Sequence, residues 1–324
     1  MRSYSIESAN GQTGLHLQNI EQPAPGTGQV LLRLHAAGLN RGELIAARTS
    51  IGPASDPKPL GSEGAGEIIQ TGANVTGLKV GDRVMGRCYG AFAEYALMDA
   101  AEAMLIPDGL SWQESAAIPL AYLVAYDMLV VQGKLQAGEW LLITGASSGV
   151  GVACLQLALA MKARVAGTSG STDKLARLTA LGLDVGIQTR GPEFRDAVMH
   201  ATQDRGANLV VNNVGGSVFD ECMRSMAYEG RFATVGYLDG QLSSTIDIGL
   251  LHAKRLVLFG VSNKLRSPAE RAALVQRFTA DILPLFASGQ LRPLIDRSYP
   301  FEELPAAIEH MEANRHVGKI VMMA

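Results

Sequence analysis

Short apolar segments separated by turn residues fill the N-terminal part of the chain. Four of them have the pattern of strands: Val30–Leu34, Gly66–Ile69, Asp82–Met85 and Ala93–Leu97. Gly, Pro and Asn cluster between these segments, for example at Pro25–Gly28, and no long helical pattern intervenes. Short strands at such close spacing predict a compact antiparallel barrel or sandwich.

A different pattern follows, in which apolar runs alternate with amphipathic segments. The apolar runs are Trp140–Thr144, Arg164–Thr168, Val185–Gln188, Leu209–Val214, Phe232–Gly236 and Leu256–Val261. The helix-like segments between them are Val150–Ala163, Thr172–Leu181, Pro192–Gln203 and Ser217–Tyr228. Alternation of helices with continuously apolar strands is typical of a parallel sheet covered on both faces. Six such strands predict an α/β, doubly wound dinucleotide-binding domain.

The last part of the chain changes pattern again. It predicts a helix over Pro268–Ser288, a strand at Leu294–Tyr299, a helix near Pro305–Asn314 and a strand at Lys319–Met323. A tail this small cannot bury a core of its own, so we expect it to pack on the N-terminal part. The expected organisation is a β-rich domain of residues 1–118 plus 266–324, with a Rossmann domain of residues 119–265 inserted in it.

Composition narrows the class of partner. The 324 residues carry a formal net charge of −3, which leaves no basic excess for nucleic acid or an anionic membrane. The 3 cysteines are scattered and form neither a disulfide framework nor a CxxC metal site, which suits a reducing cytoplasm. Met1–Ser5 lacks the apolar core of a signal peptide, and the longest apolar run, Ala116–Val131, is too short to span a bilayer. We expect a soluble, cytoplasmic protein whose partner is a small molecule.

The sharpest local signal is the glycine-rich segment Thr144–Gly151, which follows an apolar run and opens a helix. Small residues there let the backbone approach a pyrophosphate, and the helix N-terminus offers free N–H groups. An ordinary tight turn is the alternative, but the position of the segment in a six-strand alternation favours nucleotide binding. The residues expected to hold the nucleotide here are Ser147, Ser148, Gly149 and Val150.

The end of the next strand indicates which dinucleotide binds. NAD-specific sites usually carry Asp or Glu there for the ribose 2′-hydroxyl, whereas this strand ends at Thr168. The segment that holds Thr168, Ser169, Gly170 and Lys174 offers hydroxyls and a cation to a 2′-phosphate, which predicts NADPH. A helix N-cap with a merely solvated lysine is the alternative interpretation.

The remaining cofactor contacts are expected at the ends of the later strands. Ligands of open α/β sheets bind beyond the carboxyl ends of the strands. For the fourth to sixth strands these positions are Asn213, Gly236, Tyr237, Phe259 and Val261.

Several motifs together resemble the medium-chain dehydrogenase/reductase superfamily, specifically its zinc-independent quinone oxidoreductase (zeta-crystallin-like) branch. They are Ala37–Arg41, Gly61–Gly66, Val80–Val84, Gly145–Gly151 and Arg315–Val321, and the resemblance covers essentially the whole chain. It implies a GroES-like catalytic domain made from both chain ends, and many members are homodimers. The short-chain dehydrogenase family has a similar glycine-rich turn, but near its chain start, and its Tyr-xxx-Lys pair is missing here.

The same resemblance argues against a metal site. Zinc-bearing relatives use Cys and His at two ligand positions, where this chain has Asn40 and Ser62. Cys88, Cys154 and Cys222 are too few and too scattered for the structural cysteine quartet of those relatives. We therefore expect no zinc.

Two residues are candidates for catalysis. The resemblance places Asn40 beside the nicotinamide ribose and the substrate, and capping a helix over Glu43–Arg48 is its alternative role. Tyr122 is the second candidate, although an aromatic residue in an apolar run more often belongs to the core. Several relatives have a tyrosine shortly after the Asn-Arg pair, but Ala46–Ile51 contains none, so protonation by solvent stays open. Glu43 itself is interpreted as solvated or structural.

The sequence therefore predicts an NADPH-dependent oxidoreductase that reduces quinones or α,β-unsaturated carbonyls by hydride transfer. Such acceptors need no Lewis acid, because the hydride adds to a carbon conjugated with the acceptor oxygen. Two alternatives stay open: an enoyl-thioester reductase and a non-catalytic NADPH-binding protein.

Overall fold

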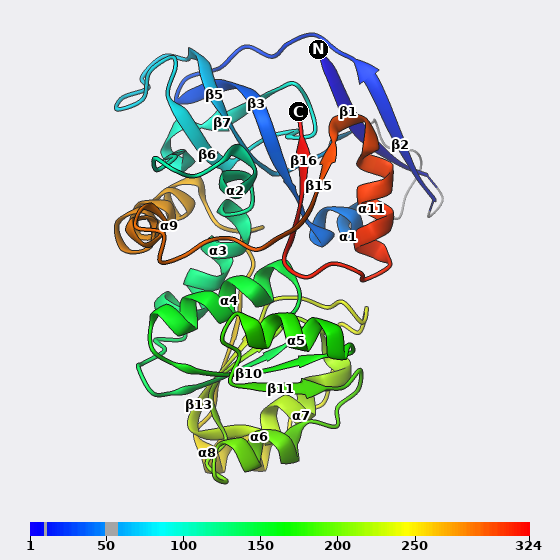
Figure 1. Cartoon of the computed structure of the whole chain (residues 1–324), viewed down its shortest axis with the longest axis vertical. Helices are drawn as coiled ribbons and strands as arrows, with labels where there is room; N and C mark the ends of the chain where they lie inside the picture. Colours follow the sequence, from blue (N-terminus) through cyan, green and yellow to red (C-terminus); the bar gives the residue numbers. More distant parts are fainter. Residues whose placement is uncertain (10–11, 49–57) are drawn as a thin grey trace. The chain divides into compact units, whose positions relative to one another are not determined.

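The computed structural model describes residues 1–9, 12–48 and 58–324, and the chain divides into two compact units (Figure 1). Unit 1 consists of Met1–Leu120 and Pro268–Ala324, and unit 2 consists of Ala121–Ser267. Residues 49–51, which end the tyrosine-free stretch, lie outside the described residues. Among the described residues, no helix has both the length and the apolar character needed to cross a membrane.

Unit 2 is built on a six-stranded, all-parallel sheet of order β11-β10-β9-β12-β13-β14. The strands are β9 (Trp140–Thr144), β10 (Arg164–Ser169), β11 (Val185–Gln188), β12 (Ala207–Asn212), β13 (Met226–Thr234) and β14 (Val257–Gly260). The order reverses between β9 and β12, as in doubly wound dinucleotide-binding folds, which confirms the predicted fold class. Buried side chains such as Leu142, Val210 and Phe232 form its core.

Three of these strands end earlier than predicted, at Asn212, Thr234 and Gly260. The reason for the first is local. Asn212 Oδ1 accepts hydrogen bonds from the amides of Val214 and Gly215, at 3.0 and 3.1 Å, and so turns the chain out of the sheet.

The helices between the strands are α4 (Gly149–Ala160), α5 (Thr172–Ala180), α6 (Arg195–Ala201), α7 (Phe219–Arg224) and α8 (Ile248–Lys254). The prediction of one helix over Ser217–Tyr228 is wrong at its end, because Met226 already begins β13. Met226 is fully buried and pairs with Ala207 across the sheet, so tertiary pairing prevails over helical periodicity. α8 lies outside the predicted elements.

Unit 1 contains two sheets. A seven-stranded sheet has the order β15-β16-β3-β5-β6-β8, with β7 also paired to β3, and a three-stranded sheet has the order β2-β1-β4. The strands are β1 (Arg2–Ala9), β2 (Gln12–Asn19), β3 (Gln29–Leu39), β4 (Lys58–Pro59), β5 (Glu63–Thr71), β6 (Arg83–Arg87), β7 (Tyr95–Asp99), β8 (Met104–Leu105), β15 (Ile295–Pro300) and β16 (Lys319–Met323). Most pairs are antiparallel, as predicted, but β15 and β16 are parallel.

The C-terminal strand completes the larger sheet. β16 pairs with β3 so that Ile320 lies opposite Leu39, which brings Lys319 to the end of β3, where the chain enters α1 (Arg41–Arg48). The other helices are α2 (Trp112–Ala116), α3 (Pro119–Tyr126), α9 (Pro268–Asp281), α10 (Leu283–Ala287) and α11 (Leu304–Glu312). The predicted helix over Pro268–Ser288 is two helices, since Pro284 has no N–H with which to continue the first one.

Candidate functional site

The glycine-rich turn of unit 2 lies at the carboxyl end of β9, where the strand order reverses. Gly145 has a φ of +61°, a conformation that favours glycine. Ser148 caps α4 by accepting a hydrogen bond from the Gly151 amide at 3.0 Å. A Cβ atom on Gly151 would lie 2.6 Å from the Ala146 carbonyl oxygen, so glycine alone permits this close approach.

This turn fits a pyrophosphate. The first amides of a helix have no intrahelical acceptors, and the helix dipole favours an anion there. The other predicted nucleotide-binding residues of the segment are half-buried: Ser147, Gly149 and Val150.

The end of β10 holds the turn in place. The Gly145 amide donates to Thr168 Oγ1 at 3.2 Å, and the Ala146 amide donates to the Thr168 carbonyl oxygen at 2.9 Å. Thr168 and Ser169 are both buried. The Thr168 hydroxyl thus supports the glycine-rich turn, and its contact with a 2′-phosphate stays a prediction.

Two basic residues border the segment that follows β10. Lys174 lies in the first turn of α5, which Ser171 caps by accepting a hydrogen bond from the Lys174 amide at 3.4 Å. Arg190 is exposed and lies over Gly170, since a Cβ atom on that glycine would be 2.9 Å from Arg190 Nε. A lysine and an arginine beside one segment suit a phosphate dianion. Arg190 is not among the residues predicted from the sequence. The signal that could have found it is a basic residue two positions after β11, the strand that pairs with β10.

Asn213 lies beside the switch point and is buried. Its side-chain amide donates to the Thr144 carbonyl oxygen at 2.9 Å, and its backbone amide donates to Thr144 Oγ1 at 3.1 Å. A Cβ atom on Gly236 would lie 2.9 Å from the Asn213 carbonyl oxygen, so the loop after β13 packs on this residue. Asn213 and Gly236 therefore shape the edge of the sheet by close packing.

Three further predicted residues follow or end the last two strands. Tyr237 is 48% exposed in the loop after β13. Phe259 is half-buried within β14, and Val261 is buried just beyond it, where its amide donates to the Thr234 carbonyl oxygen at 3.0 Å. They lie at the carboxyl edge of the sheet, so they remain candidates for the wall of the cofactor site.

Tyr122, the second catalytic candidate, is buried in unit 2. Its hydroxyl donates a hydrogen bond to Gln156 Oε1 of α4, and burial raises the pKa of the phenol above its ordinary value. The Tyr122 hydroxyl is thus engaged with α4, and its part in catalysis stays a prediction.

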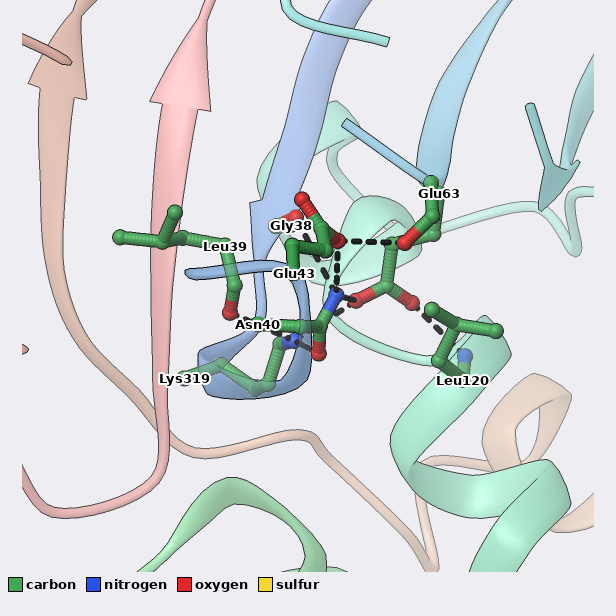
Figure 2. A network of polar contacts seen from close by, with 8 residues as sticks. Gly38, Leu39, Asn40, Glu43, Glu63, Leu120 and Lys319 are labelled. Atoms are coloured by element: carbon green, nitrogen blue, oxygen red, sulfur yellow. Dashed lines mark hydrogen bonds and ion pairs between the residues drawn. The ribbon is translucent and has the colours of Figure 1, made fainter. Parts of the chain in front are cut away.

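A buried polar cluster lies in unit 1, where β3 ends and β5 and β16 begin (Figure 2). Lys319 Nζ lies 2.6 Å from Glu63 Oε1, and the two side chains are 5% and 0% exposed. The same ammonium donates to Asn40 Oδ1 at 2.7 Å and to the Leu39 carbonyl oxygen at 3.1 Å. An ammonium has three N–H groups, and these acceptors use all three.

Glu63 receives donors on both of its oxygens. Its Oε1 accepts from Lys319 and from Asn40 Nδ2, the latter at 2.8 Å, and its Oε2 accepts from the Leu120 amide at 2.7 Å. Asn40 is therefore held at both ends of its carboxamide, and the orientation of that half-buried group is fixed.

Glu43, in the first turn of α1, adds a second carboxyl group. Its Oε1 accepts from Asn40 Nδ2 at 3.1 Å and from the Ser62 hydroxyl, whereas its Oε2 is buried and has no hydrogen-bond partner among the described residues. Burial raises the pKa of Glu43 to about 7; the bonds from Ser62 and Asn40 oppose the shift, and Glu63 adds to it. Interpreting Glu43 as solvated or structural misses this environment, because its partners are distant in the sequence.

The chemistry of the cluster does not suit zinc, which prefers thiolate and imidazole ligands. The cluster offers a carboxamide, a hydroxyl and two carboxyl groups, and the Lys319 ammonium already lies against the Glu63 carboxyl group and the Asn40 carboxamide. Cys88 is buried, and burial raises the pKa of its thiol, which disfavours the thiolate. Within residues 1–9, 12–48 and 58–324, no group of three or more His, Cys, Asp or Glu residues is arranged to hold a metal ion.

Two family models match the chain. The model described as alcohol dehydrogenase GroES-like domain matches residues 26–108, and the one described as zinc-binding dehydrogenase matches residues 181–322. Between them they cover most of the chain.

Known proteins of two kinds are similar to the chain. Polyketide synthase GfsB of Streptomyces halstedii is 34% identical over 297 residues, which are 91% of this chain and 5% of that protein. The quinone oxidoreductase-like protein 2 homolog of Nematostella vectensis is 29% identical over 305 residues, which are 92% of this chain and 82% of that one. The chain spans only 5% to 13% of the length of the first polyketide synthases that it matches.

Solved structures have the same fold. The structure of mycobacterial Rv1454c complexed with NADPH superposes with a TM-score of 0.89 at 26% identity, over 99% of this chain and 100% of that one. The apo form of JamJ enoyl reductase superposes with a TM-score of 0.86 at 25% identity, over 99% of each chain. One such neighbour thus holds NADPH, and another is an enoyl reductase.

Proposed function

Because the chain belongs to the medium-chain dehydrogenase/reductase superfamily, we propose that it is an NADPH-dependent, zinc-independent reductase of quinones or α,β-unsaturated carbonyls. The observation that carries the proposal is the glycine-rich turn at the switch point of the unit 2 sheet. The turn offers amides to a pyrophosphate, and the basic residues beside the next strand end offer charge to a 2′-phosphate. The quinone oxidoreductase-like relative supports the type of reaction.

Cofactor binding and catalysis belong to different parts of the chain in this proposal. Residues 119–265 bind NADPH, and residues 1–118 with 266–324 form the GroES-like catalytic domain. Ser147–Val150 would contact the pyrophosphate. The 2′-phosphate would be contacted by Thr168, Ser169, Gly170 and Lys174, together with Arg190. The other proposed contacts are Asn40, Asn213, Gly236, Tyr237, Phe259 and Val261.

Bound NADPH supplies the hydride for the reaction. The chain supplies orientation. Asn40 presents a carboxamide that Glu63 and Lys319 already hold, so placing the nicotinamide ribose and the substrate against it costs little further ordering. The negative charge that hydride addition leaves on the substrate spreads onto its conjugated oxygen before protonation, which suits a site built from hydrogen-bonding groups.

A second candidate function is the reduction of enoyl thioesters. The similarity to JamJ enoyl reductase favours it, and the polyketide synthase relatives are consistent with an acyl substrate. Both reactions add a hydride to a conjugated carbon and differ in the group that carries the carbonyl. We further propose that the protein is cytoplasmic and forms a homodimer. Light scattering after size-exclusion chromatography measures the mass of the particle and so tests the homodimer.

A panel of acceptors tests the proposal. Protein dialysed against a chelator is mixed with NADPH and a 1,4-quinone, a 2-alkenal or crotonyl thioester, and NADPH oxidation is followed, with NADH as control. We expect turnover of the quinone or the alkenal, faster with NADPH and unaffected by the chelator. Preference for crotonyl thioester favours the second function. Binding of NADPH without oxidation by any acceptor contradicts both.

A further inference from the structure

Two carboxyl groups share one ammonium in the unit 1 cluster, and the hydrogen bonds assign that charge to one of them. The three N–H groups of Lys319 end on Glu63, Asn40 and Leu39, so none is left for Glu43. Glu63 has donors on both oxygens. The donor count therefore pairs the ammonium charge with Glu63 and leaves Glu43 as the member that holds a proton.

The two oxygens of Glu43 lead to the same assignment. Asn40 and Ser62 both contact Oε1, whereas Oε2 is buried without a described partner. A buried carboxylate oxygen that lacks a donor is costly, and the neutral acid avoids most of that cost. Burial raises the pKa of Glu43 to about 7, in agreement with a neutral acid below that pH.

Ser62 connects this acid to the less buried side of the cluster. Its side chain is half-buried, and its carbonyl oxygen accepts the Cys88 amide at 3.0 Å, which fixes the backbone. The Ser62 hydroxyl donates to Glu43 Oε1 when Glu43 is a carboxylate. When Glu43 is neutral and carries its proton on Oε1, the same contact runs from Glu43 to Ser62 Oγ, and the hydrogen of Ser62 is free to donate elsewhere. Asn40, the residue proposed to face the substrate, contacts the same Glu43 oxygen.

We propose that Ser62 delivers a proton to the reduced substrate and that Glu43 is the source of that proton. This inference rests on the proposed function. Hydride addition to the β-carbon of an α,β-unsaturated carbonyl leaves an enolate. The O–H bond of Ser62 breaks as its proton bonds to the α-carbon, and the proton of Glu43 moves to Ser62 Oγ. Glu43 becomes a carboxylate, and water reprotonates it before the next turnover.

The groups around Glu43 predict the pH dependence of this step. Glu63 of β5 raises its pKa and Lys319 of β16 lowers it. β1 and β2 also pack against α1, and their Glu7 and His16 lie 3.5 Å apart as a pair. Beyond β6, the buried Cys88 thiol stays neutral. The rate of enone reduction should therefore fall as the pH rises through about 7, the pKa of Glu43.

The ratio of the kcat for a 2-alkenal to the kcat for a quinone tests the proton relay from Glu43 through Ser62. In Ser62→Ala and Glu43→Gln we expect the kcat for a 2-alkenal to fall about 100-fold, which is the usual contribution of a general acid. The kcat for a quinone should fall far less, because quinone oxygens take protons directly from water. Ser62→Thr should restore the alkenal rate, and Glu43→Gln should lose the decline above neutral pH. Ser225→Ala, at a buried serine of unit 2 whose hydroxyl donates to the Glu221 carbonyl oxygen, is the matched control. Unchanged ratios and pH profiles in both variants would overturn the relay.

A spectrum tests the proton of Glu43 without any turnover. Infrared difference spectra between about pH 5.5 and about pH 8.5, on either side of the expected pKa, should show a protonated carboxyl band in the wild type that Glu43→Gln lacks. Ser62→Ala should shift this band, because it removes a hydrogen-bond partner. If Glu43→Gln does not fold, Glu43→Asp should move the band instead. Absence of a titrating band overturns the assignment, whereas failure of every acceptor with an intact band overturns only the proposed function.

Discussion

The glycine-rich turn of unit 2 and the polar cluster of unit 1 are built in opposite ways. The turn uses mainly backbone groups of consecutive residues, 144–151, and it needs space for a close backbone approach together with the Ser148 cap. The cluster uses side chains that sheet pairing brings together, such as Glu63 and Lys319, which are 256 residues apart. The side chains of the cluster hydrogen-bond to one another or balance one another's charge. The turn depends on few side chains. Loss of the buried ion pair in the cluster should therefore act mainly on stability, and substitutions in the turn should act mainly on cofactor affinity.

Lys319→Met should have the largest effect, because it leaves the Glu63 carboxylate buried without its cation. We expect the free energy of unfolding of unit 1 to fall by about 3–5 kcal/mol, as measured by urea denaturation at neutral pH. Lys79→Met, at an exposed ion pair with Asp82, is the control and should change it by less than about 0.5 kcal/mol. A loss below about 1 kcal/mol in Lys319→Met would mean that the ammonium does not neutralise the cluster.

The raised pKa of Glu43 should make stability depend on pH. Its folded pKa is about 7 against an ordinary value of 4.5, so the native state binds the proton more tightly than the unfolded chain does. The resulting stabilisation is fully present below pH 4.5 and is lost as the pH rises through 7; it amounts to up to about 3 kcal/mol. The difference in unfolding free energy between the wild type and Glu43→Gln, followed across this range, isolates the effect. Parallel curves would contradict it.

Arg190→Ala tests the proposed contact with the 2′-phosphate of NADPH in unit 2. Removing a charged hydrogen-bond donor should cost about 1.5–3 kcal/mol, so the Kd for NADPH should rise between about 10-fold and about 150-fold. The Kd for NADH should stay nearly constant, because it lacks the 2′-phosphate. Lys174→Ala should act in the same direction, and Arg177→Ala, in the last turn of α5, is the control. Equal losses for the two dinucleotides would remove Arg190 from this role.

Gly151→Ala should lower the stability of unit 2 modestly and also impair binding of the dinucleotide. The added Cβ would lie 2.6 Å from the Ala146 carbonyl oxygen, and overpacking of this kind costs about 1–3 kcal/mol. Affinity for NADPH and NADH should fall together, because both carry a pyrophosphate. Gly260→Ala, where a Cβ meets nothing within 4 Å, is the control for calorimetric titration. An unchanged affinity in Gly151→Ala would indicate that the pyrophosphate lies elsewhere.

The contrast between the two regions also explains what the sequence could predict. The turn and the six parallel strands follow from local patterns, and their order along the chain fixes the topology. Asn40 was accessible through resemblance, but its partners Glu63 and Lys319 were not, since their contact depends on the register between β16 and β3. Arg190 was missed because a single basic residue in a loop has no distinguishing pattern. The proton of Glu43 is a property of burial and donor count, which a sequence does not contain.

The central claim is that the chain transfers a hydride from NADPH to a conjugated carbon and that a proton follows. The origin of the two hydrogens added to the substrate tests it most directly. A 2-alkenal is reduced in ordinary water with NADPH that carries deuterium at both C4 positions, and the saturated aldehyde is examined by mass spectrometry and NMR. Hydride transfer from NADPH followed by protonation predicts one deuterium at the β-carbon and none at the α-carbon. A product without deuterium, or with deuterium at the α-carbon, would contradict it.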